Sequence, residues 1–283
     1  MILITGAGGK TGKAIIRKLA KSGHHVRGFV HRDAQSAAAM ASGAVEVVTG
    51  SMLDKAAFRK AMLGIDAVYH ICPNMHPDEI AIGEIAIAAA IEARVKHFVF
   101  HSVLHPQTEA MPHHWHKLRV EELLLASGLR FTILQPAAYM QNILQQWPAV
   151  KNEGIYRVPY DVETKIALID LKDLASAAKT VLTAGGHHGA VYALAGPDLL
   201  SQLEIADIFS EVLGKPVRAE KIPPDVWKHQ AQQAGLGNYQ VETLLKMFRY
   251  YEEYSLRGNS NILHWLLGRS PKTFRTFAEN LKR

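Results

Sequence analysis

The sequence predicts an α/β protein whose core is a doubly wound, mostly parallel β-sheet covered by helices on both faces. Two observations carry this prediction. A short apolar run at residues 2–4 breaks into a glycine turn and continues with helical periodicity from Ala14 to Leu19. Further apolar runs then alternate with helical stretches of about 10–15 residues, which is typical of a parallel sheet with helical connections.

The elements of the first half follow from apolar periodicity and from helix start signals. Asp54 is placed to cap the helix that follows it. The expected strands, after the first one, are 25–30, 45–48, 67–71, 97–101 and 131–134. The expected helices are 33–41, 55–62, 78–94 and 117–126.

The regular alternation of strands and helices ends at Pro136. We expect a helix over 138–147 that Pro148 ends, and two strands, 166–169 and 191–194, that flank a helix over 171–182. From Leu203 onward helical patterns dominate. The predicted organisation is a dinucleotide-binding domain over 1–150, to which 160–196 returns, and a smaller, mostly helical substrate-binding lobe over 197–283.

The cysteine count and the distribution of charge exclude several classes of protein. The single cysteine, Cys72, excludes an intramolecular disulfide framework and favours a reducing, cytoplasmic location; no leader or membrane span is expected. The net charge of +6 comes mostly from residues 257–283, which hold six basic groups and one acidic group. No nucleic-acid recognition motif accompanies them, so we expect a small-molecule substrate and no nucleic acid. The oligomeric state is not predicted.

The glycine turn is the strongest functional signal. A strand, a glycine turn and a helix in this order form a site for a nucleotide pyrophosphate, because the helix N–H groups attract negative charge. Ordinary turn geometry is the alternative. The predicted cofactor-binding residues of this turn are Gly6, Gly8, Gly9, Lys10, Thr11 and Gly12.

His31 and Arg32 follow the second strand, about twenty residues past Gly12. An arginine at this point accommodates a 2′-phosphate, so the pair favours NADP (NADPH) over NAD; a plain surface charge is the alternative. Lys10 could add a second positive charge near that phosphate, or be simply solvated. Asp33 fits a helix cap better than a ribose ligand.

Ser102 and Cys72 each follow a predicted strand, at the edge where α/β sheets place ligands. Ser102 is predicted to contact substrate or nicotinamide, with a turn cap as the alternative. Cys72 is counted among the cofactor-contacting positions as a small buried packing residue. We do not expect it to be a nucleophile, because the sequence gives no activating cation near it.

At this point the residues resemble a known family, the NmrA-like branch of the atypical short-chain dehydrogenases/reductases. The resemblance rests on three stretches. These are 5–12; Lys117, Glu121 and Leu124 with 127–129, 132–136 and 139–142; and 271–274 with Phe277 and Ala278. It implies a Rossmann domain that binds NADP and a small, mixed substrate-binding lobe.

The resemblance also implies roles for particular residues. Lys117 would hydrogen-bond the nicotinamide ribose and lower the pKa of nearby proton donors; a solvated helix lysine is the alternative. The backbone around Pro136 would lie against the nicotinamide carboxamide. Tyr139, Met140 and Asn142 would line the substrate pocket, although Tyr139 could equally be a core aromatic.

Two positions depart from the family pattern. Ser51 stands where an acidic residue usually lies near the adenine, and its hydroxyl can still bond the base edge. His113 stands four residues before Lys117, where the usual tyrosine is missing. His113 is predicted either to replace that tyrosine as general acid or, with His114 and His116, to form a polar loop that leads into the helix. We expect no metal, because the spacing of these histidines lacks partner ligands.

These features predict an NADP-dependent reductase that transfers hydride to a small electron-poor acceptor such as a quinone or an enone. The alternative is a non-catalytic NADP(H) sensor that binds a protein partner, which the missing tyrosine favours. A sugar-nucleotide epimerase or dehydratase comes third, because that activity depends on the tyrosine.

Overall fold

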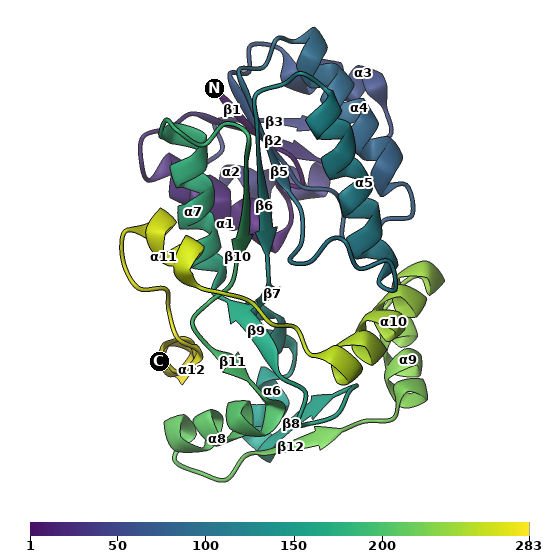
Figure 1. Cartoon of the computed structure of the whole chain (residues 1–283), viewed down its shortest axis with the longest axis vertical. Helices are drawn as coiled ribbons and strands as arrows, with labels where there is room; N and C mark the ends of the chain where they lie inside the picture. The colour runs from purple at the N-terminus through teal and green to yellow at the C-terminus, as the bar shows by residue number, and fades with distance from the viewer. Residues whose placement is uncertain (283) are drawn as a thin grey trace. The chain divides into compact units, whose positions relative to one another are not determined.

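The computed structural model describes residues 1–282, and the contacts within it define two compact units (Figure 1). The first unit comprises Met1–Gln107, His113–Pro136 and Lys172–Ala193. The second comprises Thr108–Pro112, Ala137–Leu171 and the chain from Leu194 onward. This division differs from the boundaries expected from the sequence, because residues 137–171 make their contacts within the second unit.

The first unit is built on a seven-stranded sheet in the order β10-β6-β5-β4-β1-β2-β3. Its strands are β1 (Ile2–Ile4), β2 (Val26–Val30), β3 (Glu46–Thr49), β4 (Ala67–His70), β5 (His97–His101), β6 (Phe131–Pro136) and β10 (Ala190–Leu194). All neighbouring pairs from β6 to β3 are parallel, with Leu3 opposite Arg27 on one side and Val68 on the other. The predicted Rossmann-type doubly wound sheet is confirmed.

Helices cover both faces of this sheet (Figure 1). One set is α1 (Lys10–Ala20), α2 (Ser36–Met40) and α7 (Leu171–Thr183), and the other is α3 (Lys55–Met62), α4 (Glu79–Glu92) and α5 (Pro112–Ala126). The α4 and α5 helices approach closely, since a Cβ on Gly83 would lie 2.7 Å from the Val120 side chain. Large apolar side chains such as Phe29, Phe58 and Phe98 are fully buried in the core.

Because β6, β5, β4, β1, β2 and β3 run parallel, their carboxyl ends lie at one edge of the sheet. The order of strands reverses at β1, which lies between β2 and β4. In α/β sheets of this kind, ligands bind outside the carboxyl ends of the strands beside such a reversal. Thr5 ties two of these ends together, because its hydroxyl accepts from the Ile71 N–H at 2.7 Å.

Two local predictions in the middle of the chain are wrong. The helix expected over 117–126 begins at Pro112, so His113, His114 and His116 lie on its first turns and not in a loop. The region expected as one helix ended by Pro148 is instead β7 (Ala138–Tyr139), a 3-10 helix (Met140–Gln145) and α6 (Trp147–Glu153). Proline lacks an N–H, and the first turn of a helix does not need one, so Pro112 and Pro148 both stand in the first turn of their helices.

The second unit combines small sheets with helices. Strand β9 (Ile166–Ile169) pairs parallel with β7 and antiparallel with β11 (Leu199–Leu200), while β8 (Ile155–Val158) pairs parallel with β12 (Arg218–Lys221). Its later helices are α8 (Gln202–Leu213), α9 (Pro224–Gln233), α10 (Asn238–Tyr254), α11 (Asn261–Leu267) and α12 (Phe274–Lys282). Among the described helices, none is long and apolar enough to cross a membrane.

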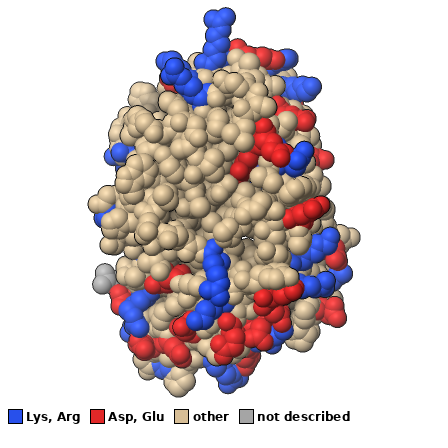
Figure 2. All heavy atoms as spheres, viewed as in Figure 1, with Lys and Arg blue, Asp and Glu red and all other residues tan. Residues whose placement is uncertain are grey.

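Charged side chains of the second unit pair with one another. Arg275 contacts Glu211 at 2.6 Å, and Lys272 contacts Asp170 at 3.3 Å. On the face drawn in Figure 2, acidic and basic side chains stand mixed where Figure 1 places β12 and the helices beside it. That part of the face therefore does not carry charge of a single sign.

Candidate functional site

The glycine turn joins β1 to α1 and leaves the first turn of that helix open. Gly6 has φ of +59°, and Gly9, in an extended conformation, precedes the helix without any side-chain cap. The first turn of α1 holds no acidic residue. The first N–H groups of a helix have no partner within the helix, and together with the positive end of the helix dipole they favour an anion.

Close packing explains why the turn needs glycine at Gly12. A Cβ there would collide with the Gly6 carbonyl oxygen and lie 2.8 Å from Ala7 Cα, both backbone atoms that cannot give way. Thr11 and Gly12 are buried, whereas Gly9 and Lys10 are exposed. The chain is thus exposed where the helix begins and buried one residue later.

Arg32 and His31 lie on an exposed turn that one side chain fixes in place. Gln35 Oε1 accepts the N–H groups of His31 and Arg32, both at 3.1 Å. The same side chain lies against the glycine turn, 2.9 Å from where a Cβ on Gly8 would stand. Arg32, and not Asp33, is the N-cap of the following 3-10 turn, which corrects the expected cap. Gln35 was not predicted, although its place three residues after a cap is a recognisable capping-box spacing.

Ser51 and Cys72 follow β3 and β4. The Ser51 hydroxyl accepts the Leu53 N–H at 3.2 Å, so it closes a local turn while keeping its own hydrogen. Its contact with adenine stays a prediction. Cys72 is 5% exposed, and burial together with the nearby Glu79 carboxylate raises the pKa of its thiol well above the usual value. The thiol is therefore protonated at neutral pH and packs as a small buried side chain.

A buried ion pair lies at the same edge of the sheet. Lys117, on α5, contacts Glu79, the first residue of α4, with 2.5 Å between Nζ and Oε1. The Glu79 side chain is 1% exposed and that of Lys117 is 13% exposed. Burial lowers the pKa of Lys117, but the Glu79 carboxylate, with smaller contributions from Cys72 and Glu121, raises it, and the net pKa lies above the usual value. The solvated-lysine alternative is wrong, because this ammonium is enclosed and paired.

Glu121, one helical turn after Lys117, connects the ends of two strands. It accepts a very short hydrogen bond from the Ser102 hydroxyl, beyond β5. Gln135 Nε2, on β6, donates to both Glu121 oxygens at 3.0 Å. Burial raises the pKa of Glu121. Ser102 is 2% exposed, and since its hydrogen is given to Glu121, it can meet a ligand only as an acceptor.

His113 lies on the same face of α5 as Lys117, four residues earlier, and is 6% exposed. Its Nδ1 has no hydrogen-bond partner in the described structure. Burial, and then the neighbouring His114 and Lys117, lower the pKa of His113 to about 2. The imidazole is therefore neutral at ordinary pH and has no acidic proton to give. This disfavours the predicted general-acid role.

His114 is also buried, and its Nδ1 contacts the carbonyl oxygen of His105 at 3.0 Å, while His116 is half-buried. Within residues 1–282, no cluster of three or more His, Cys, Asp or Glu side chains could hold a metal ion.

The predicted substrate-contacting residues begin after Pro136 and belong to the second unit. Tyr139 is half-buried and Asn142 is exposed, so both are accessible. Met140 is 0% exposed, so its side chain packs inside that unit and lines no accessible pocket in this structure. Between them, Gln141 donates to Asp170 at 3.1 Å and accepts the Leu171 N–H at 3.0 Å.

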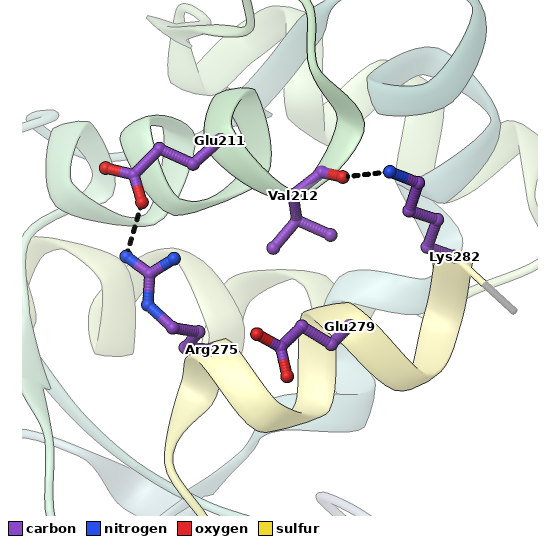
Figure 3. Close-up of a pocket in the computed structure, with 5 residues that line it drawn as sticks. All are labelled: Glu211, Val212, Arg275, Glu279 and Lys282. Atoms are coloured by element: carbon purple, nitrogen blue, oxygen red, sulfur yellow. Dashed lines mark hydrogen bonds and ion pairs between the residues drawn. The ribbon is translucent and has the colours of Figure 1, made fainter.

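Two hollows in the molecular surface lie away from these residues. Figure 3 shows one of about 330 Å³ between α8 and α12, where Arg275 faces Glu211 and Lys282 donates to the Val212 carbonyl oxygen at 2.7 Å. Another, of about 230 Å³, is lined by α3 and α4 residues such as Arg59 and Glu92. Neither of these two hollows includes a predicted site residue.

Known proteins resemble this chain over most or all of its length. The model of the NmrA-like family matches residues 1–280. An NAD(P)H azoreductase from Xenophilus azovorans is 28% identical over 284 residues, which are 99% of this chain and 97% of that protein. A (4-alkanoyl-5-oxo-2,5-dihydrofuran-3-yl)methyl phosphate reductase from Streptomyces griseus is 33% identical over 229 residues, 80% of this chain and 78% of the relative.

A similar solved structure is an NADPH-dependent quinone oxidoreductase from Escherichia coli in complex with NADPH. It matches this chain with a TM-score of 0.87 and 26% identity, and the match covers 100% of both chains.

Proposed function

The chain belongs to the NmrA-like family, and from that premise we propose that it is an NADPH-dependent reductase of small electron-poor molecules such as quinones or enones. The relatives named above support the reaction class, because each is named as a reductase or a quinone oxidoreductase. A cytoplasmic location is part of the proposal, which the single, buried and reduced Cys72 supports.

The observation that carries the proposal is the pairing of two features at one sheet edge. The open N-terminus of α1 offers backbone N–H groups to a diphosphate, and the buried Lys117 ammonium lies at the ends of the neighbouring strands. Gly12, at which a Cβ would collide with backbone, gives the turn the close packing that dinucleotide sites need. These residues fit a dinucleotide.

The other predicted residues would each contact a different part of the coenzyme. Gly6, Gly8, Gly9 and Thr11 would surround the diphosphate. Arg32, with His31 and Lys10 nearby, would meet the 2′-phosphate, and Ser51 the adenine. Cys72 and the Pro136 backbone would lie against the nicotinamide end. When bound, the reduced coenzyme supplies a hydride, which is two electrons and one proton.

Reduction of a quinone or an enone by hydride also requires one proton from elsewhere to balance the negative charge. Lys117 keeps its ammonium form, since the nearby carboxylate raises its pKa. We therefore propose that the positive charge of Lys117 stabilises the developing negative charge on the acceptor through space, without a hydrogen bond to it, and that water delivers the proton. Neither His113, which is neutral, nor Ser102, which donates to Glu121, is the proton source in this proposal.

Substrate contact is assigned to the accessible residues that follow β6. Tyr139 offers an aromatic face to a planar acceptor and Asn142 an amide. The sensor alternative keeps one supporting observation, which is that the position of the missing tyrosine holds a buried, neutral His113.

Turnover separates the two functions. NADPH absorbance is followed with a panel of quinones and enones for the unmodified protein, for Lys117→Ala, and for Arg119→Ala as an exposed control on the same helix. A reductase loses turnover in Lys117→Ala while Arg119→Ala stays active. Tight NADPH binding without turnover on any acceptor would establish the sensor instead.

A further inference from the structure

One carboxylate oxygen of the buried ion pair, Glu79 Oε2, is not bonded to Lys117. Glu79 Oε1 contacts Lys117 Nζ, but Glu79 Oε2, on a side chain 1% exposed, has no hydrogen-bond partner among the described residues. Buried polar atoms are almost always hydrogen-bonded in native proteins, and an exception calls for an explanation. A carboxylate oxygen is a strong acceptor, so the missing partner is a donor.

Lys117 also has bonding capacity to spare. Its ammonium has three hydrogens. Glu79 Oε1 takes one at 2.5 Å, and the His101 carbonyl oxygen lies 3.5 Å from Nζ. The ring of Phe100 lies beneath, with 5.7 Å between Nζ and its centroid. One hydrogen is therefore left for a ligand.

Glu79 Oε2 and the remaining hydrogen of Lys117 are complementary to one functional group. A carboxylate only accepts hydrogen bonds and an ammonium only donates them. A hydroxyl does both, so a single hydroxyl can fill the two positions at once. A carbonyl oxygen would satisfy Lys117 alone, and an N–H group would satisfy Glu79 alone.

We propose that Glu79 and Lys117 together bind a ligand hydroxyl, with Glu79 Oε2 accepting its hydrogen and Lys117 Nζ donating to its oxygen. The inference rests on the proposed function, which supplies two hydroxyl sources: the nicotinamide ribose of the coenzyme and the hydroxyl of a reduced acceptor. Glu79 is then a ligand-binding residue in its own right as well as the residue that positions Lys117.

The test compares ligands that do and do not carry the nicotinamide ribose. The variant is Glu79→Gln, and its control is Glu84→Gln, an exposed carboxylate on the same helix. NADPH affinity is measured by fluorescence or calorimetry beside that of adenosine 2′,5′-bisphosphate, which has only the adenosine end. We expect Glu79→Gln to weaken NADPH binding about tenfold or more, the usual effect of losing a charged hydrogen bond. The bisphosphate affinity and both affinities of Glu84→Gln stay unchanged.

Other outcomes would assign the hydroxyl to the acceptor, overturn the inference or overturn the proposed function. NADPH binding unchanged, with the KM of the acceptor or inhibition by its reduced form weakened about tenfold, would assign the hydroxyl to the acceptor. Equal losses for NADPH and the bisphosphate, or no change in any constant, would overturn the inference. Absence of NADPH binding by the unmodified protein would instead overturn the proposed function.

A second comparison covers the case in which Glu79→Gln does not fold, because it leaves a buried ammonium poorly paired. Lys117→Met is compared with the double variant Lys117→Met and Glu79→Gln, which has no buried charge at this point. A further loss of NADPH affinity in the double variant supports direct contact by Glu79. Equal affinities of the two would mean that Glu79 acts only through Lys117, and would overturn the inference.

Discussion

The two ends of the candidate site are constructed differently. The glycine turn would bind a ligand through backbone N–H groups, as proposed above, and the charged side chains near it, Lys10 and Arg32, are exposed. The end beside α4 and α5 consists of buried ionisable side chains, with Lys117 paired to Glu79 and Ser102 bonded to Glu121. Substitutions at the turn should therefore change ligand binding, whereas substitutions at the buried end should also change stability.

The largest expected effect tests the buried end. Lys117→Met leaves the Glu79 carboxylate buried without its partner and should lower the free energy of unfolding by about 3–5 kcal/mol. Adding Glu79→Gln removes the second charge and should restore much of that loss. Urea unfolding of the two variants checks this. If the single and double variants were equally stable, the unpaired Glu79 charge would not be the cause of the loss.

A smaller effect is expected where the turn packs on its helix. Gly12→Ala places a Cβ against the backbone of Gly6 and Ala7, and overpacking of this kind costs about 1–3 kcal/mol. NADPH affinity should fall as well, because the turn must shift. Gly23→Ala is not a suitable control, since Gly23 has a φ of +81°. Lys13→Ala, in the same helix, serves instead. Unchanged thermal stability and affinity of Gly12→Ala would contradict the packing argument.

Acid should weaken the buried end through its histidines. Burial lowers the pKa of His113 to about 2 and, in the same unit, that of His70 and His101 to about 3. Below the unfolded pKa of about 6.5, the unfolded chain binds protons that the folded chain does not. Stability is thus fully present above that pH and falls below it by up to about 1.4 kcal/mol per pH unit for each such histidine.

Urea unfolding at several pH values between neutrality and pH 4 measures this slope. His113→Gln should make the slope shallower by the contribution of one histidine, and the exposed His25→Gln is the matched control. A slope that is the same in all three proteins would show that His113 is protonated in the folded state.

The smallest effect on stability, and the most selective one on binding, is expected at the exposed turn. Arg32→Asp should weaken NADPH binding about tenfold or more while leaving NADH binding and the unfolding free energy nearly unchanged. Calorimetry with both coenzymes measures the ratio of affinities. An equal loss of affinity for both coenzymes would show that Arg32 does not bind the 2′-phosphate.

Local patterns identified most of the first unit. The strand at 97–101 and the helix at 55–62 occur where apolar periodicity places them, and Asp54 caps that helix by accepting the Ala56 N–H. Such features depend on neighbouring residues. Strand β12 was missed because its sequence, Arg-Ala-Glu-Lys, has no β-branched or aromatic residue and depends on pairing with β8.

The site was only partly predictable for the same reason. Lys117 was identified through the family motif, but its partner Glu79 lies 38 residues earlier, on another helix. Glu121 was noted as part of the motif without a role, since its bonds to Ser102 and Gln135 exist only once the strand ends lie side by side. Long-range pairing of this kind leaves no signal in the spacing of one sequence.

Gln35 has a practical consequence for redesign. The amide oxygen of Gln35 accepts the backbone N–H groups of both His31 and Arg32. The shape of that loop therefore does not depend on the charge of the His31 and Arg32 side chains. An engineer who wishes to change the preferred coenzyme can therefore alter the displayed side chain alone and leave its scaffold intact. The anchor itself should be kept constant in any library made at this corner of the protein.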